Sequence, residues 1–127
     1  MLTCILKSKI HRGIITGADV DYMGSITIDK TLMEHANILP FEKVMVASIN
    51  SGERLETYAI EGESNSGVMC MNGAAAKKIK KGEKVIIFSF AYMEEKELSG
   101  YRPKIIYVDD KNRIIIEKDH VEKDDQC

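Results

Sequence analysis

The feature that most limits the fold is a series of short apolar segments separated by turn residues at close spacing. The most apolar segment, residues 84–93, contains Val-Ile-Ile-Phe-Ser-Phe and is expected to form a central strand. Short helical pieces are expected over 30–36, with Asp29 as N-cap, and from Asn72 to Ala76, and the charged segment 94–99 is expected to be helical or irregular. The pattern predicts a mainly β fold, a small β-barrel with short helical segments. Further strands are expected over residues 2–16, 25–28, 43–49, 54–61, 68–71, 104–108 and 113–117.

Length, charge and composition exclude several classes of protein. A chain of 127 residues fits one domain, and a net charge of −2 argues against a nucleic-acid partner. No apolar run is long enough to span a bilayer, and the N-terminus lacks the features of a signal peptide. The three cysteines and three histidines are scattered, which argues against a disulfide framework or a metal site and favours a cytoplasmic location. Residues 118–127 form a polar tail that is expected to fray.

The first predicted strand is locally basic, because it carries Lys7, Lys9, His11 and Arg12. Basic side chains commonly protect the edge strand of a sheet from pairing with other chains. Unless an anionic ligand is indicated independently, we expect this segment to be such a solvated edge, with Gly13 at a bulge or bend.

The dipeptide Gly24–Ser25 precedes a strand and permits an unusual reaction. A serine hydroxyl can attack the carbonyl of the preceding residue, if the backbone is held in a strained shape and donors face the oxyanion. Glycine at position 24 is expected to allow such a shape, because it has no Cβ. The alternative interpretation is a simple turn, which these two residues alone favour.

Two further segments carry groups suited to chemistry. In the predicted strand 54–61, Arg54 and Tyr58 share one face, and Thr57 lies on the other. Arg54 can bind a carboxylate, and Tyr58 can donate a proton. The alternatives are that Arg54 is an ordinary surface charge and that Tyr58 packs in the barrel. The run Asn72-Gly73-Ala74-Ala75 exposes backbone N–H groups that suit an anion or oxyanion, whereas the alternative is a plain N-cap.

Taken together, these segments resemble the pyruvoyl-dependent aspartate 1-decarboxylase family. The resemblance extends to about residue 112 and depends on the order and spacing of motifs that are weak singly. Ala47 and Asp21 depart from the aromatic residue and the histidine that relatives often carry at these positions. The matching segments are Lys9–Arg12, Ala18-Asp19, Tyr22-x-Gly24-Ser25, Ile28-Asp29, Asn50-x-Gly52-x-Arg54, Thr57–Ile60, Asn72–Ala76, Gly82-Glu83 and Arg102-Pro103.

The resemblance implies a double-psi β-barrel assembled as a homotetramer, with active sites between subunits. It implies that the chain cuts itself between Gly24 and Ser25 into a β chain, residues 1–24, and an α chain, residues 25–127. Ser25 would become a pyruvoyl group, with neither metal nor pyridoxal phosphate as cofactor. That group would form a Schiff base with L-aspartate, whose decarboxylation yields β-alanine for pantothenate and coenzyme A biosynthesis.

The resemblance also implies roles for individual residues. Tyr58 would be the proton donor, and Thr57 and Asn72 would assist the cleavage between Gly24 and Ser25, in which the Gly24 carbonyl is attacked. Substrate would be bound by Lys9, His11, Arg54, Thr57, Asn72, Gly73, Ala74 and Ala75. Because Thr57 and Tyr58 lie on opposite faces of a regular strand, both can line one site only through a twist, a bulge or backbone contacts.

Two alternatives come from other classes of protein. A small β-barrel can be a binding module without catalytic activity, because fold does not determine function. A serine hydrolase that uses Ser25 is less favoured, since the chain has no Gly-x-Ser-x-Gly elbow.

Overall fold

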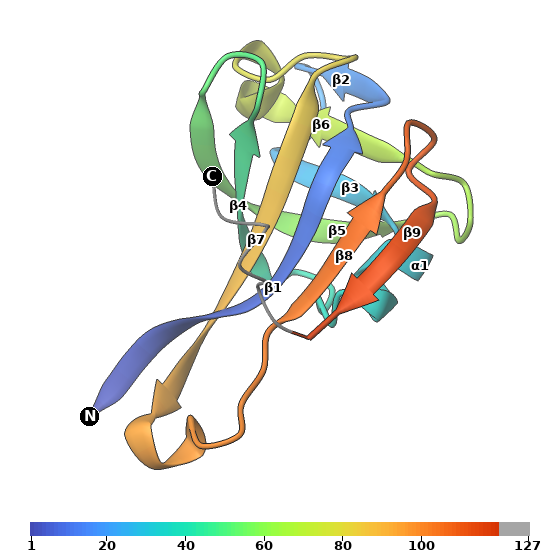
Figure 1. The fold of residues 1–127 in the computed structure, drawn as a ribbon. Helices are drawn as coiled ribbons and strands as arrows, with labels where there is room; N and C mark the ends of the chain where they lie inside the picture. Colours follow the sequence, from blue (N-terminus) through green and yellow to red (C-terminus); the bar gives the residue numbers. More distant parts are fainter. Residues whose placement is uncertain (120–127) are drawn as a thin grey trace.

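The computed structural model describes residues 1–119 and shows a mainly β chain with short helical pieces (Figure 1). The predicted strands and helical segments are confirmed, within one or two residues at most ends. Strand β2 was not predicted. The elements are β1 (Leu2–Ile14), β2 (Gly17–Asp19), β3 (Ser25–Asp29), α1 (Lys30–His35), β4 (Lys43–Ser48), β5 (Arg54–Gly62), β6 (Met69–Asn72), η1 (Gly73–Lys77), β7 (Lys84–Glu94), η2 (Glu95–Glu97), β8 (Lys104–Val108) and β9 (Ile114–Lys118).

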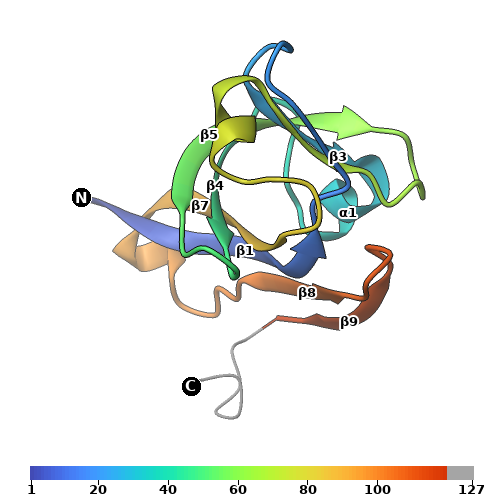
Figure 2. The same ribbon diagram turned by 90° about the horizontal axis from the view of Figure 1, so that it is seen from above.

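The strands of residues 1–119 follow one another in the order β2-β6-β3-β5-β4-β7-β1-β8-β9. Seen from above, they curve around a common interior, which confirms the predicted small barrel (Figure 2). The pairs β2–β6, β3–β5 and β1–β8 are parallel and the other pairs are antiparallel. Strand β7 lies between β4 and β1, so the most apolar segment is central, as predicted.

Alternation along β3 and β6 divides their side chains between the core and the opposite face. Ile26, Ile28, Met69 and Met71 are each 0% exposed and belong to the hydrophobic core. Side chains alternate across a strand, so the residues between and beside these four face away from the core. The polar side chains of both strands therefore share the outer face of this strand pair.

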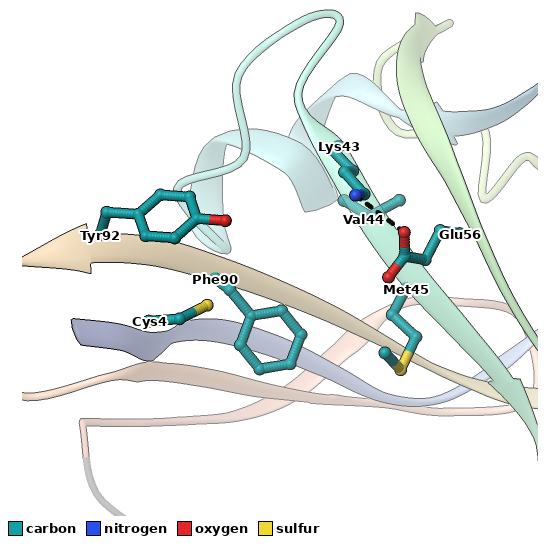
Figure 3. A pocket seen from close by; sticks show the side chains of 7 residues that line it. All are labelled: Cys4, Lys43, Val44, Met45, Glu56, Phe90 and Tyr92. Carbon is teal, nitrogen blue, oxygen red and sulfur yellow. Dashed lines mark ion pairs between the residues drawn. The ribbon is translucent and has the colours of Figure 1, made fainter. Parts of the chain in front are cut away.

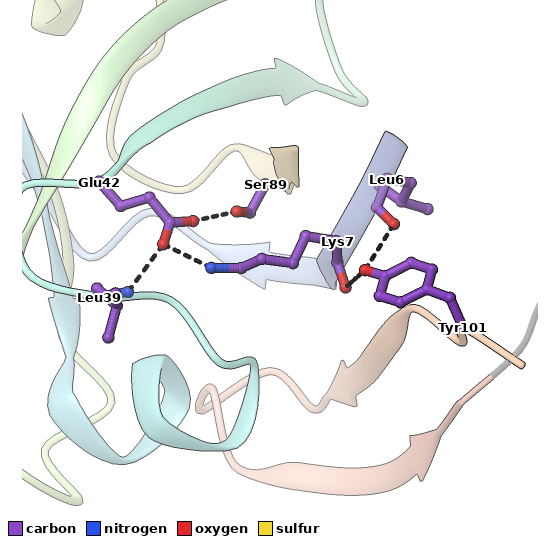
Figure 4. A network of polar contacts seen from close by, with 6 residues as sticks. All are labelled: Leu6, Lys7, Leu39, Glu42, Ser89 and Tyr101. Carbon is purple, nitrogen blue, oxygen red and sulfur yellow. Dashed lines mark hydrogen bonds and ion pairs between the residues drawn. The ribbon is translucent and has the colours of Figure 1, made fainter. Parts of the chain in front are cut away.

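The basic segment of β1 is not a sheet edge, and that prediction is wrong, because β1 lies between β7 and β8. Lys7 is mostly buried and donates to Glu42 Oε1 at 2.6 Å (Figure 4). Glu42 also accepts from the Ser89 hydroxyl and from the backbone N–H of Leu39. This network fastens β1 and β7 to the segment that enters β4. The predicted irregularity near Gly13 is confirmed by a register shift between His11 and Gly13.

Asp29 caps α1, as predicted, and also fixes a loop. Its carboxylate accepts from the N–H of Thr31 at 2.8 Å, of Asn65 at 2.9 Å and of Gly67 at 2.8 Å. The side chain is 2% exposed, so three backbone donors compensate for the loss of water around a buried carboxylate. Asn37 has a φ of 60°, which fits its predicted place at the end of the helix.

The C-terminal hairpin is confirmed by the antiparallel pairing of β8 with β9. Lys118 is the last residue of β9, so the polar tail begins later than predicted. Residues 120–127 of that tail lie outside the described residues. Within residues 1–119, no helix has the length and apolar character needed to cross a membrane.

Candidate active site at the start of β3

The segment that contains Gly24 runs from β2 to β3 and passes across the end of β6, the strand that lies between them. Strand β6 is paired on one side with β2 and on the other with β3. At its last position, Asn72 lies opposite Asp19 of β2 and Ser25 of β3. Residues 20–24 connect these two flanking strands, so they must pass across the end of β6 at Asn72 and Gly73.

Ser25 is buried although its neighbours in this segment are exposed. The side chain of Met23 is 77% exposed, whereas Ser25 is 1% exposed. The Ser25 hydroxyl donates to the Met23 carbonyl at 3.3 Å and accepts from Asn72 Nδ2 at 3.0 Å. A buried hydroxyl is thus held directly beside the peptide bond that joins it to an exposed loop.

Asn72 contacts Ser25 instead of capping the helix that follows. It occupies the N-cap position of the 3-10 helix η1, as the alternative has it, but its side chain makes no capping hydrogen bond. Its Nδ2 instead donates to Ser25 Oγ and to Thr27 Oγ1, both at 3.0 Å. The Cys70 thiol donates to Asn72 Oδ1 at 3.5 Å. Burial, followed by the charge of Asp19, raises the pKa of this thiol.

Gly73, and not Gly24, is the glycine that this geometry requires. Gly73 has a φ of 71°, and a Cβ there would lie 2.6 Å from Gly24 Cα and 3.0 Å from the Tyr22 carbonyl oxygen. A Cβ at Gly24 would meet nothing within 4 Å, and Gly24 has no left-handed φ. The structure therefore shows no left-handed backbone at Gly24 itself, and the close approach of the two segments depends on Gly73. The crossing segment lies so close to Gly73 that only glycine fits there.

Strand β5 presents Tyr58, and not Thr57, on the outer face. Ala59 is 0% exposed and pairs with Ile26 of β3, so Tyr58 and Ser25 each lie one position before this pair. Thr57 shares its face with Ala59 and thus faces the core side. The β4–β5 register runs through both residues without a shift, so no bulge brings them to one face. Arg54 is exposed at the start of β5, roughly 13 Å along the strand from Tyr58.

Lys9 and His11 lie elsewhere in the sheet. Both are half-buried on β1, which is separated from β3 by β7, β4 and β5 in the strand order. The Lys9 ammonium lies 5.7 Å from the centre of the Phe88 ring, and the His11 ring contacts Tyr107 edge to face at 5.0 Å. Lys9 and His11 therefore lie on a strand that pairs with β7 and β8 and not with β3, the strand of Ser25.

Ala74 and Ala75 follow Gly73 in η1, so the predicted helical turn at this position is confirmed. Ala74 is exposed and Ala75 is half-buried. The first N–H groups of such a short helix have no partner within the helix, so they remain donors near Ser25.

A hollow on the barrel surface contains none of the predicted site residues. Figure 3 shows Phe90, Tyr92 and Cys4 on one side of it and the Lys43–Glu56 ion pair on the other. Within residues 1–119, no group of three or more His, Cys, Asp or Glu side chains is placed to hold a metal ion.

Sequence reasoning missed two residues of the site, Thr27 and Cys70. Thr27 could have been found, because it lies two positions after Ser25 on a strand and so shares its face. Cys70 could not, because its contact with Asn72 matters only once β6 is known to pair with β3.

This arrangement defines a class of protein: a small β-barrel in which a buried serine hydroxyl accepts a hydrogen bond from an amide directly after an exposed loop. A serine hydroxyl is a group that can attack the carbonyl of the residue before it, given a route for its proton.

Comparison with known proteins gives the family. The model of the aspartate decarboxylase family matches residues 1–115, and the chain belongs to this family. The aspartate 1-decarboxylase of Thermoanaerobacter pseudethanolicus is 56% identical over 109 residues, which cover 86% of this chain and 93% of that protein. Aspartate 1-decarboxylases of Clostridium botulinum strain Loch Maree (51%, covering 90% of both chains) and Dehalococcoides mccartyi (54%, covering 87% and 89%) are also similar.

Proposed function

We propose that the chain cuts itself between Gly24 and Ser25, and that the resulting pyruvoyl enzyme converts L-aspartate to β-alanine and CO₂ for pantothenate and coenzyme A biosynthesis. The observation that carries this proposal is the buried Ser25 hydroxyl, which accepts from Asn72 beside an exposed Gly24. Family membership supports aspartate as the substrate. Within residues 1–119, Cys4 and Cys70 are free thiols, which fits a reducing cytoplasm.

The self-cleavage is an exchange of bonds followed by an elimination. Ser25 Oγ bonds to the Gly24 carbonyl carbon as the C–N bond breaks, and the hydroxyl proton moves to the released nitrogen. Loss of the Ser25 α-proton then breaks the Cβ–Oγ bond, which leaves a Gly24 carboxylate and a dehydroalanine. Water replaces the amino group of dehydroalanine as ammonia, and a pyruvoyl group remains. In the elimination, negative charge develops on Oγ, the atom to which Asn72 donates.

The fold keeps the two products together. Residues 1–24 contain β1 and β2, and β1 pairs with β7 along eleven register positions and with β8 along four. Strand β2 pairs with β6. A cut in the exposed segment 20–24 therefore removes one covalent bond and leaves these hydrogen-bonded pairs in place.

The residues around Ser25 fit the group that it would become. A pyruvoyl group supplies a ketone that takes up the substrate amine and accepts the electrons released when the carboxylate leaves. Asn72 Nδ2 and the N–H groups of Ala74 and Ala75 are donors suited to its oxygens. Tyr58, on the same outer face, would return the proton to the substrate carbon. Arg54 and Lys9 would bind the carboxylates of the substrate, Arg54 through its planar fork.

The separation of the site residues supports an oligomer. His11 and Lys9 lie on β1, and within one chain the strand order sets them apart from β3. One substrate would contact both groups if β1 of one subunit approached β3 of a neighbour. The exposed apolar side chains of Val20, Tyr22 and Met23, which precede the scissile bond, suit contact with another subunit. We therefore propose a homotetramer with active sites between subunits. Because the Thr57 side chain faces the core side of β5, we propose that Thr57 acts through its backbone or from that side.

Ser25→Ala tests the source of the catalyst. The variant is expected to fold, to remain one chain of 127 residues and to make no β-alanine, whereas the surface variant Ser99→Ala is cut and active. Intact-mass analysis and an assay for β-alanine give both readouts. A wild-type protein that stays uncut after prolonged warm incubation and makes no β-alanine would refute the enzyme proposal in favour of a non-catalytic binding module.

Tyr58→Phe separates self-cleavage from turnover. The variant is expected to cut at the wild-type rate but to lose roughly 100-fold in kcat for decarboxylation, because only the proton donor is removed. Tyr92→Phe, at a tyrosine that is 75% exposed, is the matched control. Equal loss of cleavage and turnover in Tyr58→Phe would contradict a separate proton-donor role.

A further inference from the structure

The outer face of β3 and β6 carries a square of four polar side chains around the Asn72 amide. Ser25 pairs with Asn72 across the strands, and Thr27 pairs with Cys70. Asn72 Nδ2 lies 3.0 Å from both hydroxyl oxygens, and its Oδ1 lies 3.5 Å from Cys70 Sγ. Thr27 and Cys70 take no part in the bond exchange at Gly24, yet both contact the residue that donates to Ser25.

The contacts at Ser25 determine which way the amide points. The single hydroxyl hydrogen of Ser25 is donated to the Met23 carbonyl, so Ser25 Oγ can only accept from Asn72. In this orientation both Nδ2 hydrogens have an acceptor, one on Ser25 and one on Thr27. If the amide were rotated by half a turn, Asn72 Oδ1 would face Ser25 Oγ, and the hydroxyl could donate to it only by giving up its hydrogen bond to the Met23 carbonyl.

Cys70 stabilises the same orientation from the other side of the amide. Its thiol is a weak donor with two acceptors in reach, Asn72 Oδ1 at 3.5 Å and the Met71 carbonyl at 3.8 Å, and Oδ1 is the nearer. In the rotated amide a weak sulfur acceptor would face Nδ2 instead. Burial raises the pKa of this thiol, which keeps the donated hydrogen in place at neutral pH. Cys70 lies on β6 between β2 and β3, so the strands on both sides hold its backbone.

We propose that Thr27 and Cys70 are positioning residues for self-cleavage: together they hold the Asn72 amide with Nδ2 toward Ser25 Oγ. The inference rests on the proposed self-cleavage at Ser25. A fixed donor matters because negative charge gathers on Oγ when its proton leaves and again when the Cβ–Oγ bond breaks. An amide free to rotate would present a repelling oxygen for part of the time.

The test measures the first-order rate of self-cleavage of freshly prepared uncut chain, by intact mass. Cys70→Ala and Thr27→Val are each expected to cut about five- to tenfold more slowly than wild type, the effect of one misplaced hydrogen bond. Thr27→Ser, which keeps the hydroxyl, and Cys70→Ser, which replaces the thiol by a hydroxyl donor at the same place, are expected to cut at close to the wild-type rate. Thermal unfolding midpoints of all four variants serve as the control for a merely structural effect.

A double-mutant comparison shows whether the effect passes through Asn72. In an Asn72→Ala background, Cys70→Ala is expected to cause no further slowing, since the amide that it positions is gone. Equal slowing by Cys70→Ala in both backgrounds, or a wild-type rate in Cys70→Ala and Thr27→Val while wild type is cut, would overturn the inference alone. A wild-type chain that is never cut would overturn both this inference and the proposed function.

Discussion

The two ends of β3 each bury a polar side chain and use it differently. Asp29, at the end of the strand, is 2% exposed and accepts three backbone N–H donors within 2.9 Å. Ser25, at the start, is 1% exposed, and its hydroxyl has one side-chain donor and one carbonyl acceptor. Both groups are satisfied, so burial alone does not distinguish a structural residue from a reactive one.

The difference lies in what each group holds. The Asp29 carboxylate ties a helix and a loop to the strand, and its partners are backbone groups in three places. The Ser25 hydroxyl hydrogen-bonds to Asn72 and to the carbonyl of Met23 in its own entering segment, and Ser25 follows Gly24 in the chain. Loss of Asp29 should therefore cost stability, and loss of Ser25 should cost chemistry.

Gly73→Ala is expected to have the largest combined effect on self-cleavage and stability, because its new side chain would displace the backbone next to Ser25, at the start of β3. The new Cβ would meet the Gly24 backbone at 2.6 Å at a φ that L side chains rarely adopt. We expect self-cleavage to be slowed at least 100-fold, with a loss of about 2 to 4 kcal/mol in the free energy of unfolding.

Gly24→Ala is the matched control for that variant. A Cβ at Gly24 meets nothing within 4 Å, so the stability is expected to stay within about 0.5 kcal/mol of wild type. Intact mass and urea unfolding measure both variants. A larger loss in Gly24→Ala than in Gly73→Ala would mean that the crossing segment is not shaped by its contact with Gly73.

Asp29→Ala breaks the structural end of the strand. Three backbone donors lose their acceptor, so we expect the free energy of unfolding to fall by about 3 kcal/mol. Below its lowered unfolding midpoint the variant should still cut itself at the wild-type rate. Asp110→Ala, at an exposed ion pair 3.8 Å long with Lys84, should change stability by less than about 1 kcal/mol. A stable Asp29→Ala protein that fails to cut itself would contradict the assignment of a structural role to the Asp29 end of β3.

The sequence was sufficient to predict features that depend on neighbours along the chain. Alternation predicted β3, Asp29 was predicted as the cap of α1, and Gly24–Ser25 and Asn72 were singled out from local chemistry. Features that depend on strand pairing were not predictable. The partner of Asn72 is Ser25 and not its own helix, because an antiparallel pair brings together residues 47 positions apart. The basic face of β1 was misassigned to an edge for the same reason.

Apart from the control variants, replacing the carboxylate of Glu83 should give the smallest change in the free energy of unfolding. The Ser48 hydroxyl, followed by the backbone N–H of Lys80, lowers the pKa of Glu83 below its ordinary value of about 4.3. A lowered pKa in the folded state means that its stabilisation is present above pH 4.3 and is lost as the pH falls through the lowered value. Glu83 is half-buried at the surface, so Glu83→Gln is expected to cost less than about 1 kcal/mol at pH 7 and less again near pH 2. Urea midpoints at the two pH values check this, and an equal cost at both would contradict it.

The central claim is that Ser25 is consumed to make the reactive carbonyl, and the mass of the new N-terminus tests it most directly. We predict two chains, residues 1–24 and 25–127, with the longer one lighter by one ammonia than a chain that begins with serine. Reaction of that N-terminus with a hydrazide, which requires a ketone, should accompany the mass loss. An active protein that remains a single chain of 127 residues, or whose longer piece begins with an intact serine, would contradict the account.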